Sequence, residues 1–573
     1  MSALFVNRWF SIVTRMHWLV SALVLLAAGS LAAQDSGSAT GISVRGIVLN
    51  SITGQGVPRA LVGLSGDLAT LTGGDGQFSF DNVPAGQYLV SVSKPGYQGF
   101  GNTGGSRGPR VVKGAMLWSN LPPRHLQVGG EMPSVTLHLA PAAVITGVVT
   151  LSTADPADGI AVNLYRQSMQ YGHPAWTTAG HATTRSDGSY RFGNLPPGSY
   201  MVSTGASLDH PEGEAASRLA VWGYPPVYYP GVTDPGSAGV ITVTAGQQGE
   251  ADLSVTRQAF FPVTAAVRAS EGRMAANFEV LDTGGNQTGM AAHFDPREQV
   301  VRMNVPNGTW TLEGRLFGRE TAAGQAQFVV AGAPVGLAIS LSQIPRVPVN
   351  VQRDFTGTAT TTSSGPGVNL VLTPADAFST NGIGGGMAPV PGSDGTTWSL
   401  NVIQPGRFWV VAFPNGGAYV SSITSGGVDL ASNPLIVMPG SMPSEIDVTL
   451  RDDGGSISGQ VNAESGGAGS SAPGSSAASG DSPVVTVFAI PLFPTSQAMP
   501  STTVGSDGTF NIGHVAPGSY RMLACEGTPA IDYHRPEGLS VWAGKGQTVT
   551  VDPSGTAHVT LDVEHGLEGT PTP

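Results

Sequence analysis

Residues 73–92, GGDGQFSFDNVPAGQYLVSV, contain a complete strand–turn–strand pattern. The Asp-Gly pair at 75–76 favours a tight turn, because Gly tolerates positive φ and Asp accepts local hydrogen bonds. Phenylalanines then alternate with polar residues, which is typical of a half-buried strand. Pro-Ala-Gly at 84–86 makes a second turn, and a second alternating strand begins at Tyr88. The stretch therefore predicts a β-hairpin with a fixed register.

The hairpin pattern is repeated along the chain. It returns as SDGSYRFGNLPPGSYMVS at 186–203 and as SDGTFNIGHVAPGSYRMLA at 506–524, with the two turn glycines ten residues apart in each copy. Weaker copies are SDGTTWSLNVIQPGRFWVVA at 393–412 and VVRMNVPNGTWTL at 300–312, the second of which has lost its Asp-Gly pair. The turn and core positions predicted for the three clear copies are Asp75, Gly76, Gly86, Tyr88, Asp187, Gly188, Gly198, Tyr200, Asp507, Gly508, Gly518 and Tyr520.

Each hairpin is accompanied by further strand-like segments. Two of them precede it, and an alternating strand such as SVTLHLA at 134–140 or HVTLDV at 558–563 closes the unit. The closing strands recur at intervals of about 100 residues, which is the size of a seven-strand sandwich. We therefore predict an all-β chain of about five tandem β-sandwiches, of which the third and fourth are degenerate. The predicted domains are 41–140, 141–256, 257–345, 346–452 and 453–565.

The first unit resembles the carboxypeptidase regulatory-like domain, a transthyretin-like (prealbumin-like) β-sandwich. The resemblance covers residues 44–97 and is carried by Gly46, Pro58, Ala60, the hairpin pattern and KPGY at 94–97. The second and fifth units match the pattern well, and the other two match it loosely. The whole chain is also similar to large secreted proteins of soil bacteria that are built from such modules. The resemblance implies a fold and no catalytic residues.

Composition limits the classes of partner. Charged residues make up 12% of the chain and the formal net charge is −12, with no run of basic residues. Phosphate binding needs clustered Lys and Arg, so these values argue against nucleic acid. The single cysteine, Cys525, excludes an internal disulfide, so each domain depends on its own core. The Ser/Gly/Ala-rich insertion 463–482 in the fifth unit is predicted to be disordered.

The N-terminus has the pattern of a targeting segment. Arg8 and Arg15 precede the apolar stretch WLVSALVLLAAG at 18–29, and small residues follow it. This pattern predicts a secretory signal peptide at 1–33, and the alternative is an uncleaved N-terminal anchor. No second long apolar run occurs, so we expect no membrane span after signal cleavage. The protein is expected to be exported to the periplasm, the outer surface or the medium.

Two short motifs match catalytic patterns. GGSRG at 104–108 has the Gly-x-Ser-x-Gly spacing around Ser106, but that nucleophile needs a strand before it and a helix after it, and the flanks here are glycine-rich. HRPE at 534–537 has the His-x-x-Glu spacing of zinc carboxypeptidases, yet zinc needs a third ligand, and His558 and His565 are the downstream candidates. Pro536 and Glu537 instead fit a turn. We expect no catalytic residue, no metal and no cofactor.

One aromatic segment is the best surface candidate for ligand binding. Trp222, Tyr224, Tyr228 and Tyr229 lie among prolines, and stiff loops with exposed aromatics stack on sugars or dock partners. The alternative is that these rings cap the open end of the second sandwich or fill its interface with the third. Trp118 invites the same argument.

The sequence as a whole indicates an exported, non-catalytic, multi-domain β-sandwich protein. It would act as an envelope or extracellular scaffold, or as an adhesion or binding protein, with a protein or polysaccharide partner at the cell envelope. One alternative is a carbohydrate-binding accessory protein that uses the exposed aromatic loops. The least favoured alternative is a zinc-dependent peptidase.

Overall fold

The computed structural model describes residues 41–564, apart from 66–67, 100–110, 113–114, 117–123, 130–133, 210–219, 270–275, 317–321, 345, 358–364, 377–383, 391–396, 403–404, 439–440, 442, 463–484, 506 and 527–528. The predicted signal peptide, the whole of the predicted disordered insertion at 463–482, Ser106 and Trp118 therefore lie outside the described residues. Within the described part of the chain, no helix is long and apolar enough to cross a membrane.

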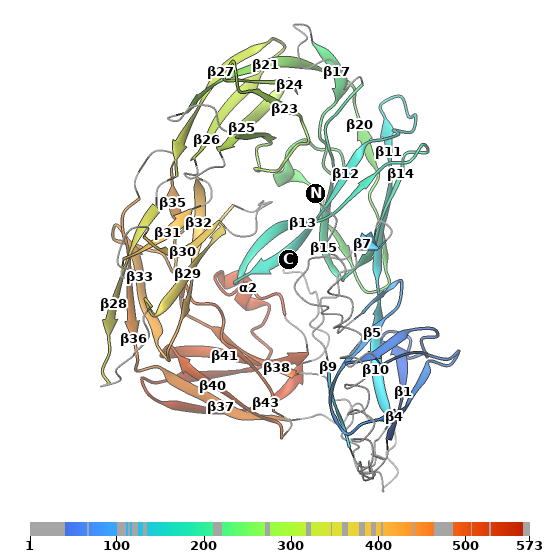
Figure 1. Cartoon of the computed structure of the whole chain (residues 1–573), viewed down its shortest axis with the longest axis vertical. Coiled ribbons are helices and arrows are strands. Elements are labelled where there is room, and N and C mark those ends of the chain that lie inside the picture. The colour runs from blue at the N-terminus through green and yellow to red at the C-terminus, as the bar shows by residue number, and fades with distance from the viewer. Residues whose placement is uncertain are drawn as a thin grey trace, which may run out of the picture.

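The described chain is built from strands, as predicted, and its units share one plan. In every unit the opening strand pairs antiparallel with the strand that follows the Asp-Gly turn or its counterpart. The same opening strand pairs in parallel with the closing strand of its unit. A hairpin strand, the opening strand and the closing strand thus form one half of each sandwich (Figure 1).

The first and second sandwiches follow this plan closely. In the first, the strands are β1 (Ile42–Asn50), β2 (Leu61–Leu64), β3 (Leu68–Leu71), β4 (Gln77–Val83), β5 (Gly86–Ser93), β6 (Tyr97–Gln98), β9 (Arg124–Val128) and β10 (Val135–Pro141), with a separate short pair β7 (Val111–Val112) and β8 (Ala115–Met116). In the second, they are β11 (Ala143–Leu151), β12 (Ala161–Gln170), β13 (His173–Thr183), β14 (Ser189–Leu195), β15 (Gly198–Thr204), β18 (Ile241–Val243), β19 (Gln248–Glu250) and β20 (Leu253–Val255), with the 3-10 helix η2 (Pro235–Ser237).

The third sandwich departs from the plan where its sequence is degenerate. Its strands are β21 (Gln258–Ala269), β22 (Ala276–Leu281), β23 (Ala292–Asp295), β24 (Val300–Pro306), β25 (Gly308–Leu316), β26 (Ala322–Val330) and β27 (Val335–Gln343). Two strands from the segment predicted to belong to the second sandwich, β16 (Ser207–Leu208) and β17 (Val221–Tyr224), join its sheet: β17 pairs with β21, and β16 pairs with β17. The segment between β15 and β18 of the second sandwich therefore contributes two strands to the sheet of the third.

The fourth and fifth sandwiches complete the chain. The fourth contains β28 (Arg346–Asp354), β29 (Val368–Pro374), β30 (Gly385–Pro389), β31 (Trp398–Val402), β32 (Gly406–Pro414), β33 (Tyr419–Ser425), β34 (Val428–Asp429), β35 (Leu435–Val437) and β36 (Ile446–Arg451). The fifth contains β37 (Gly455–Asn462), β38 (Val485–Pro491), β39 (Ser501–Thr503), β40 (Thr509–Val515), β41 (Gly518–Glu526), α2 (Pro536–Ser540), β42 (Gln547–Val551) and β43 (Thr556–Glu564). The segment from Pro536 is thus a short helix rather than the simple turn expected from sequence.

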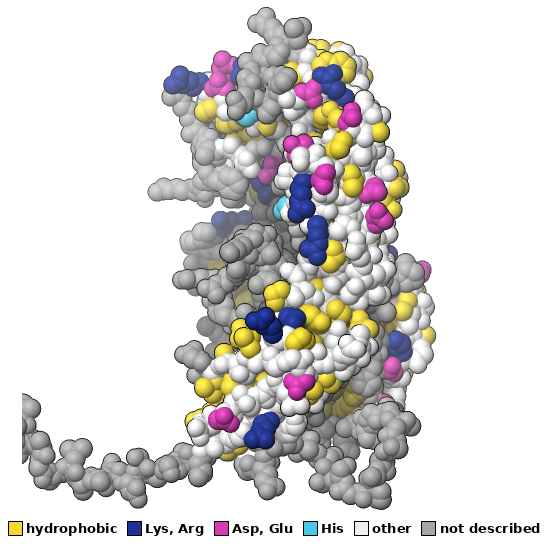
Figure 2. Space-filling model, turned by 90° about the vertical axis from the view of Figure 1, so that its right-hand side faces the viewer, with side chains coloured by type: hydrophobic (Ala, Val, Ile, Leu, Met, Phe, Trp, Pro, Cys, Tyr) yellow, Lys and Arg dark blue, Asp and Glu magenta, His cyan; other side chains and the backbone are white. Residues whose placement is uncertain are grey.

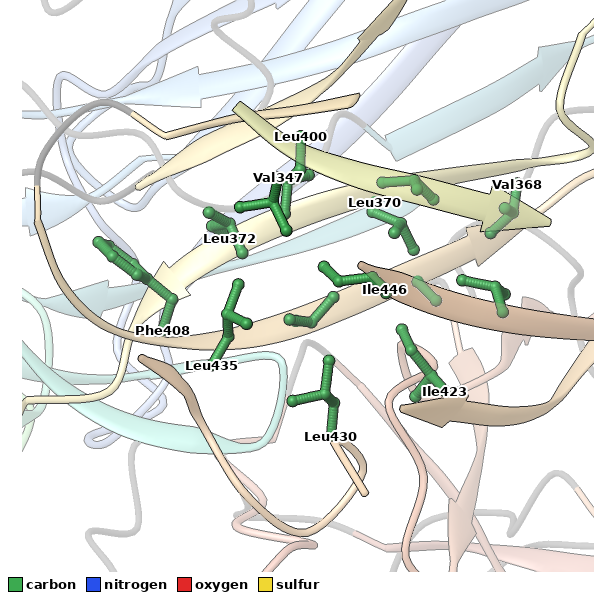
Figure 3. Packing of buried hydrophobic residues seen from close by; sticks show 14 of the residues in the cluster. Val347, Val368, Leu370, Leu372, Leu400, Phe408, Ile423, Leu430, Leu435 and Ile446 are labelled. Atoms are coloured by element: carbon green, nitrogen blue, oxygen red, sulfur yellow. The ribbon is translucent and has the colours of Figure 1, made fainter. Parts of the chain in front are cut away.

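Each sandwich buries its own hydrophobic cluster between its two layers. Figure 3 shows the cluster of the fourth sandwich, where Leu370, Leu372 and Leu400 point inward and are fully buried. This unit has the weaker hairpin motif, yet its alternation of apolar residues supplies a complete core. Alternation is therefore maintained in this unit although its turn motif is weaker.

The sandwiches are arranged along an arc. In Figure 1 the second, third, fourth and fifth follow one another around the molecule, and the first lies beside the second, which it contacts through the Gln98 side chain and the Asn194 carbonyl. The hairpin of β12 and β13 extends from the second sandwich across the arc toward α2. Its tip meets both the fourth and the fifth sandwich, and this contact closes the arc.

Candidate functional site at the junction of three sandwiches

The β12–β13 hairpin is much longer than its counterpart in the first sandwich. Its strands have 10 and 11 residues, whereas β2 has four. The two residues between them, Tyr171 and Gly172, both have positive φ, at 50° and 83°. Positive φ at both central positions is the mark of a type I′ turn, whose twist matches that of the paired strands. The hairpin therefore presents a compact tip, residues 171–173, away from its own core.

The hairpin tip is held by aromatic contacts to two other sandwiches. The His173 imidazole is stacked between Trp409 of β32, at 4.1 Å between ring centroids, and His534 of the fifth sandwich, at 3.9 Å. The rings of both pairs are nearly parallel, with interplanar angles of 3° and 6°. Tyr171 packs edge-on against Phe413 at 5.5 Å. The His534 Nε2–H donates a hydrogen bond to the Tyr171 carbonyl oxygen at 3.1 Å.

Gly172 is required by the closeness of this packing. A Cβ atom at this position would lie 2.6 Å from Cζ of the Tyr533 ring, which is closer than real Cβ contacts come. Because Gly172 also has positive φ, glycine satisfies both the turn and the contact. The backbone of the hairpin tip, as well as its side chains, therefore contacts the fifth sandwich.

The stacked histidines are neutral at pH 7. Burial is the main cause that lowers the pKa of His173 to about 3, and the nearby His534 and Arg535 lower it further. Burial also lowers the pKa of His534, against the opposing effects of its hydrogen bond to Tyr171 and the Asp532 carboxylate. Two imidazoles 3.9 Å apart cannot both carry a charge at low cost, so the stack depends on their neutral forms.

Asp532 fixes the loop that carries His534. Its carboxylate is 1% exposed and accepts hydrogen bonds from the backbone N–H groups of His534 at 3.3 Å and Arg535 at 3.2 Å. It also forms an ion pair with Nε of the Arg535 guanidinium. A buried carboxylate with three donors is satisfied, and it orients the arginine that is bound to it.

The loop between β38 and β39 joins the fourth and fifth sandwiches beside this stack. The Ala412 N–H donates to the Ser496 carbonyl oxygen at 2.8 Å, and the Val420 N–H donates to Oε1 of Gln497 at 3.2 Å. The first of these bonds belongs to a parallel bridge between Ala412 of β32 and Gln497, which continues backbone pairing across the domain interface. The fourth and fifth sandwiches, which both contact the hairpin tip, are therefore also bonded to each other.

A pocket of about 610 Å³ opens where the three sandwiches meet. We call it the junction pocket. The second sandwich contributes His173 and Pro174, and the fourth contributes Ala375, Trp409, Ala431 and Ser432. The fifth contributes Leu492, Phe493, Pro494, Tyr533, His534, Arg535, Pro536 and Leu539. No lining residue of this pocket is a carboxylate, and Arg535 is its one permanently charged group among the described residues.

A second cleft, of about 590 Å³, lies among the second, third and fourth sandwiches, and its mixed lining includes five carboxylates and two arginines. Its two buried carboxylates are already engaged. Asp282 accepts a 2.5 Å hydrogen bond from the Tyr228 hydroxyl, and Glu313 is bound by Arg315 and by the Gln325 amide at 2.7 Å. We interpret this cleft as a set of satisfied polar contacts, of which the Tyr228–Asp282 bond joins two sandwiches.

The aromatic segment predicted to bind ligands is divided by the structure. Trp222 is 48% exposed, and the Arg257 guanidinium lies 4.9 Å from its ring centroid. Tyr228 is 2% exposed and bonds to Asp282 and Asn286 of the third sandwich. Burial and the Asp282 charge raise the pKa of the Tyr228 hydroxyl above its usual value.

The other two tyrosines of the segment pack against the core of the second sandwich. Tyr224 and Tyr229 are both half-buried there. Only Trp222 of the four therefore presents a large exposed ring. Ligand binding by this segment stays a prediction.

The predicted turn residues share one geometry. Asp75, Asp187 and Asp507 each accept a 3.0 Å hydrogen bond from the backbone N–H two residues later. The hydroxyl groups of Tyr88, Tyr200 and Tyr520 each donate to the carbonyl oxygen four residues earlier, at 3.0, 2.6 and 2.7 Å. The glycines that follow the aspartates, Gly76, Gly188 and Gly508, have φ between 73° and 84°. Gly198 and Gly518 have φ of 153° and 152°, and Gly86 begins β5.

The HRPE motif does not gather metal ligands. His534 is stacked on His173, while Glu537 is exposed on α2. His558, in β43, bonds through Nδ1 to the Ser458 hydroxyl of the neighbouring β37 at 2.9 Å, and His565 lies outside the described residues. Among the described residues, no group of three His, Cys, Asp or Glu side chains is placed to hold a metal ion.

His173 and Trp409 were missed by sequence reasoning. The signal that precedes His173 is the unusual length of the alternating segment on either side of Tyr-Gly at 171–172, which predicts a hairpin projecting beyond its sandwich. No local signal pairs it with Trp409 or His534, because the contact joins residues as far apart as 363 positions.

Comparison with known proteins supports a family likeness in the first sandwich. A model of the carboxypeptidase regulatory-like domain matches residues 43–105. This confirms the resemblance predicted there. No curated protein matches the chain in sequence.

Several solved structures are similar over parts of the chain. They include the Bacillus anthracis TIE protein (13% identity, 52% of this chain and 50% of that one, TM-score 0.16) and the minor pilin GBS52 of Streptococcus agalactiae (13% identity, 37% and 95%, TM-score 0.20). A streptococcal ancillary pilin is also similar (9% identity, 52% and 99%, TM-score 0.18). The chain spans about half the length of the TIE protein. The family likeness is thus that of residues 43–105 to the carboxypeptidase regulatory-like domain.

Proposed function

We propose that this chain is an exported, non-catalytic scaffold or binding protein of the cell envelope. The observation that carries the proposal is the contact of the β12–β13 hairpin with the fourth and fifth sandwiches. Tandem domains joined only by linkers move relative to one another by default. A contact between distant domains removes this freedom and holds the loops and sheet edges of several sandwiches in a fixed arrangement. Such an arrangement suits a surface that presents or binds large partners.

The surface is consistent with this role. On the face shown in Figure 2, charged side chains lie singly or in small groups among uncharged surface. The chain as a whole is only 12% charged. Its contacts with a partner would therefore come chiefly from neutral polar and apolar groups.

The test is a fractionation of producing cells followed by a sedimentation assay. We expect the full chain in the exported fraction, and we expect the purified protein to pellet with isolated cell-envelope polysaccharide or envelope fragments. An unrelated secreted β-sandwich protein of similar charge is the control. Retention in the cytoplasm, or failure to pellet with every envelope fraction, would contradict the proposal.

A second candidate function is carbohydrate binding through Trp222. The ring is 48% exposed, and Arg257, which is itself paired with Asp209 at 2.7 Å, lies close to it. Aromatic rings held in this way stack on sugars. We expect Trp222→Ala to abolish glycan retention if this function holds. Val240→Ala, which also truncates an exposed apolar side chain, is the control and should retain it. Equal retention by the two variants would exclude Trp222 as the site.

A further inference from the structure

We propose that the junction pocket binds a small, flat, apolar ring compound that carries a carboxylate, and that this ligand holds the hairpin tip in place. The proposal goes beyond the scaffold function and does not depend on where the protein is exported. It assigns a ligand class to a pocket that three sandwiches build together.

The size and position of the pocket fit a small-molecule site. Ligand pockets are typically about 300–1,000 Å³ and occur preferentially at domain interfaces. The junction pocket, at about 610 Å³, lies between the second, fourth and fifth sandwiches. Because all three contribute walls, the pocket exists only while the hairpin tip is docked.

The walls select for a flat apolar body. Trp409, Phe493, Leu492 and Leu539 line the pocket, and prolines from two of the sandwiches complete its apolar surface. Phe493 is itself fixed by an edge-on contact with Tyr520, at 5.3 Å between ring centroids. Aromatic rings in fixed positions favour offset or edge-on contact with another flat ring.

The polar groups select for a negative charge. Arg535 binds Asp532 through Nε, and its two terminal guanidinium nitrogens have no hydrogen-bond partner among the described residues. The Asp532 carboxylate is 1% exposed, so it anchors the arginine while leaving those nitrogens available. The lining has no carboxylate to repel an anion, and His173 and His534 are neutral. A guanidinium presents paired N–H groups that match a carboxylate.

Ligand binding and domain closure are therefore linked. A ligand that contacts all three walls binds the docked form better than the undocked form, and it shifts the equilibrium toward docking. The same reasoning predicts that a substitution which undocks the hairpin tip lowers the affinity of the pocket for the ligand.

The first experiment measures affinity of the full chain for two matched probes by equilibrium dialysis. The probes are naphthalene-2-carboxylate and 2-naphthalenemethanol, which share the ring and differ in charge. We expect the carboxylate to bind at least about tenfold more tightly, which corresponds to about 1.4 kcal/mol. Glucuronate, a carboxylate without a flat ring, should bind more weakly than either naphthalene probe. Equal affinities for the two naphthalene probes, no binding of the carboxylate, or tighter binding of glucuronate would overturn the proposal.

Substitutions of Arg535 test whether this residue is responsible for the preference for a carboxylate. Arg535→Gln should remove the preference for the carboxylate, and Arg535→Lys should keep part of it. Arg407→Gln is the control, because Arg407 is an exposed arginine paired with Asp376 in the other cleft. An undiminished preference in Arg535→Gln would overturn the assignment. The comparison of probes on the unaltered chain remains decisive if this variant folds poorly.

Glycine variants test the link to closure. Gly172→Ala, which places a methyl group against Tyr533, should weaken naphthalene-2-carboxylate binding at least tenfold. Gly159→Ala is the control, because Gly159 also has positive φ, at 73°, but has open space around it. Equal affinity in the two variants would show that the hairpin is not a wall of the site.

Discussion

Gly46, Gly147 and Gly459 occupy the same place in three of the five units. Each lies in the opening strand, opposite an aromatic residue of the hairpin strand. An added Cβ at each would overlap a main-chain carbonyl oxygen in or next to the closing strand of its sandwich. Each of these glycines, which has a valine two residues later, is therefore needed for close approach of strands rather than for a turn.

We expect Gly459→Ala to destabilise the fifth sandwich by about 1–3 kcal/mol, because the methyl group forces β37 away from β43. Gly513→Ala is the matched control in the same sandwich, since a Cβ there meets nothing within 4 Å. Native-state hydrogen exchange of the β43 amides measures the local free energy of opening. Equal protection in the two variants would contradict this role for Gly459.

The repeated tyrosine has a second residue-scale role. A tyrosine hydroxyl that bonds to the backbone a few residues upstream is a known corner of β-sandwiches. In the third unit Trp310 replaces it, and its Nε1–H donates to the Pro306 carbonyl at 3.0 Å. The bond is therefore kept when the residue type changes.

We expect Tyr520→Phe to cost about 1 kcal/mol or more, because the hydroxyl is lost from a 2% exposed site and the Ala516 carbonyl loses its donor. Tyr88→Phe should cost less, because Tyr88 is only half-buried and water can replace its hydroxyl. The measurement is the exchange protection of β41 and β5 in each variant. A larger loss in Tyr88→Phe would refute this explanation.

At the scale of elements, the β12–β13 hairpin differs from its counterparts because its length serves another domain. Its base belongs to the second sandwich through pairing of β12 with β15. Its tip contributes nothing to that core and packs instead on Trp409, His534 and Tyr533. Undocking of the tip should therefore leave the second sandwich folded.

We expect Gly172→Ala to increase hydrogen exchange in the hairpin tip and in α2 while leaving β14 and β15 protected. The cause is the overlap of the new methyl group with Tyr533. Gly159→Ala introduces similar backbone strain without that overlap, and it should leave α2 unchanged. If α2 exchanges equally in both variants, the hairpin does not hold the fifth sandwich.

At the scale of the whole molecule, three interfaces set the arrangement. The second and third sandwiches share β17–β21 pairing and the bond from Tyr228 to Asp282. The fourth and fifth share the backbone bond from Ala412 to Ser496. The hairpin tip then connects the second sandwich to both of the last two. Of these contacts, the His173–His534 stack is the one whose groups have a lowered pKa in the docked form and the ordinary histidine pKa of about 6.5 when undocked.

Acid should open the arc. The pKa of His173 is lowered to about 3 in the docked form, so docking is fully favourable above the ordinary histidine pKa of about 6.5 and weakens as pH falls below it. At pH 4.5 the equilibrium should move by up to about a hundredfold toward the undocked form. Arg535 reinforces this effect, and the Asp532 carboxylate near His534 opposes it.

Small-angle X-ray scattering between pH 7.5 and 4.5 measures the change as an increase in radius of gyration. His173→Phe keeps a flat ring without a charge and should remove the pH dependence. His181→Phe, on the same strand but bonded to Asn163, is the control and should keep it. A radius independent of pH in the unaltered chain would contradict the prediction.

The tandem sandwich architecture could be read from the chain because its signals are local. Asp-Gly turns, the Pro-x-Gly-x-Tyr corner and alternation all lie within about twenty residues, and each expresses a backbone or burial preference of those residues alone. The first unit also carries enough of the pattern to match a known domain at 43–105. The third unit is the least predictable from sequence. It lacks the Asp-Gly pair, and its sheet includes β16 and β17 from the segment before it.

The junction was decided by tertiary contacts. His173, Trp409 and His534 come from three sandwiches, and each has an ordinary local context in a strand or loop. The pKa shifts of the two histidines and the junction pocket arise only when the hairpin tip buries these rings together. Tyr228 is likewise buried against Asp282, which lies 54 residues away in sequence. The aromatic residues next to Tyr228 in the sequence therefore do not indicate that it is buried. Local preference specifies each sandwich, whereas the packing of sandwiches depends on which surfaces meet.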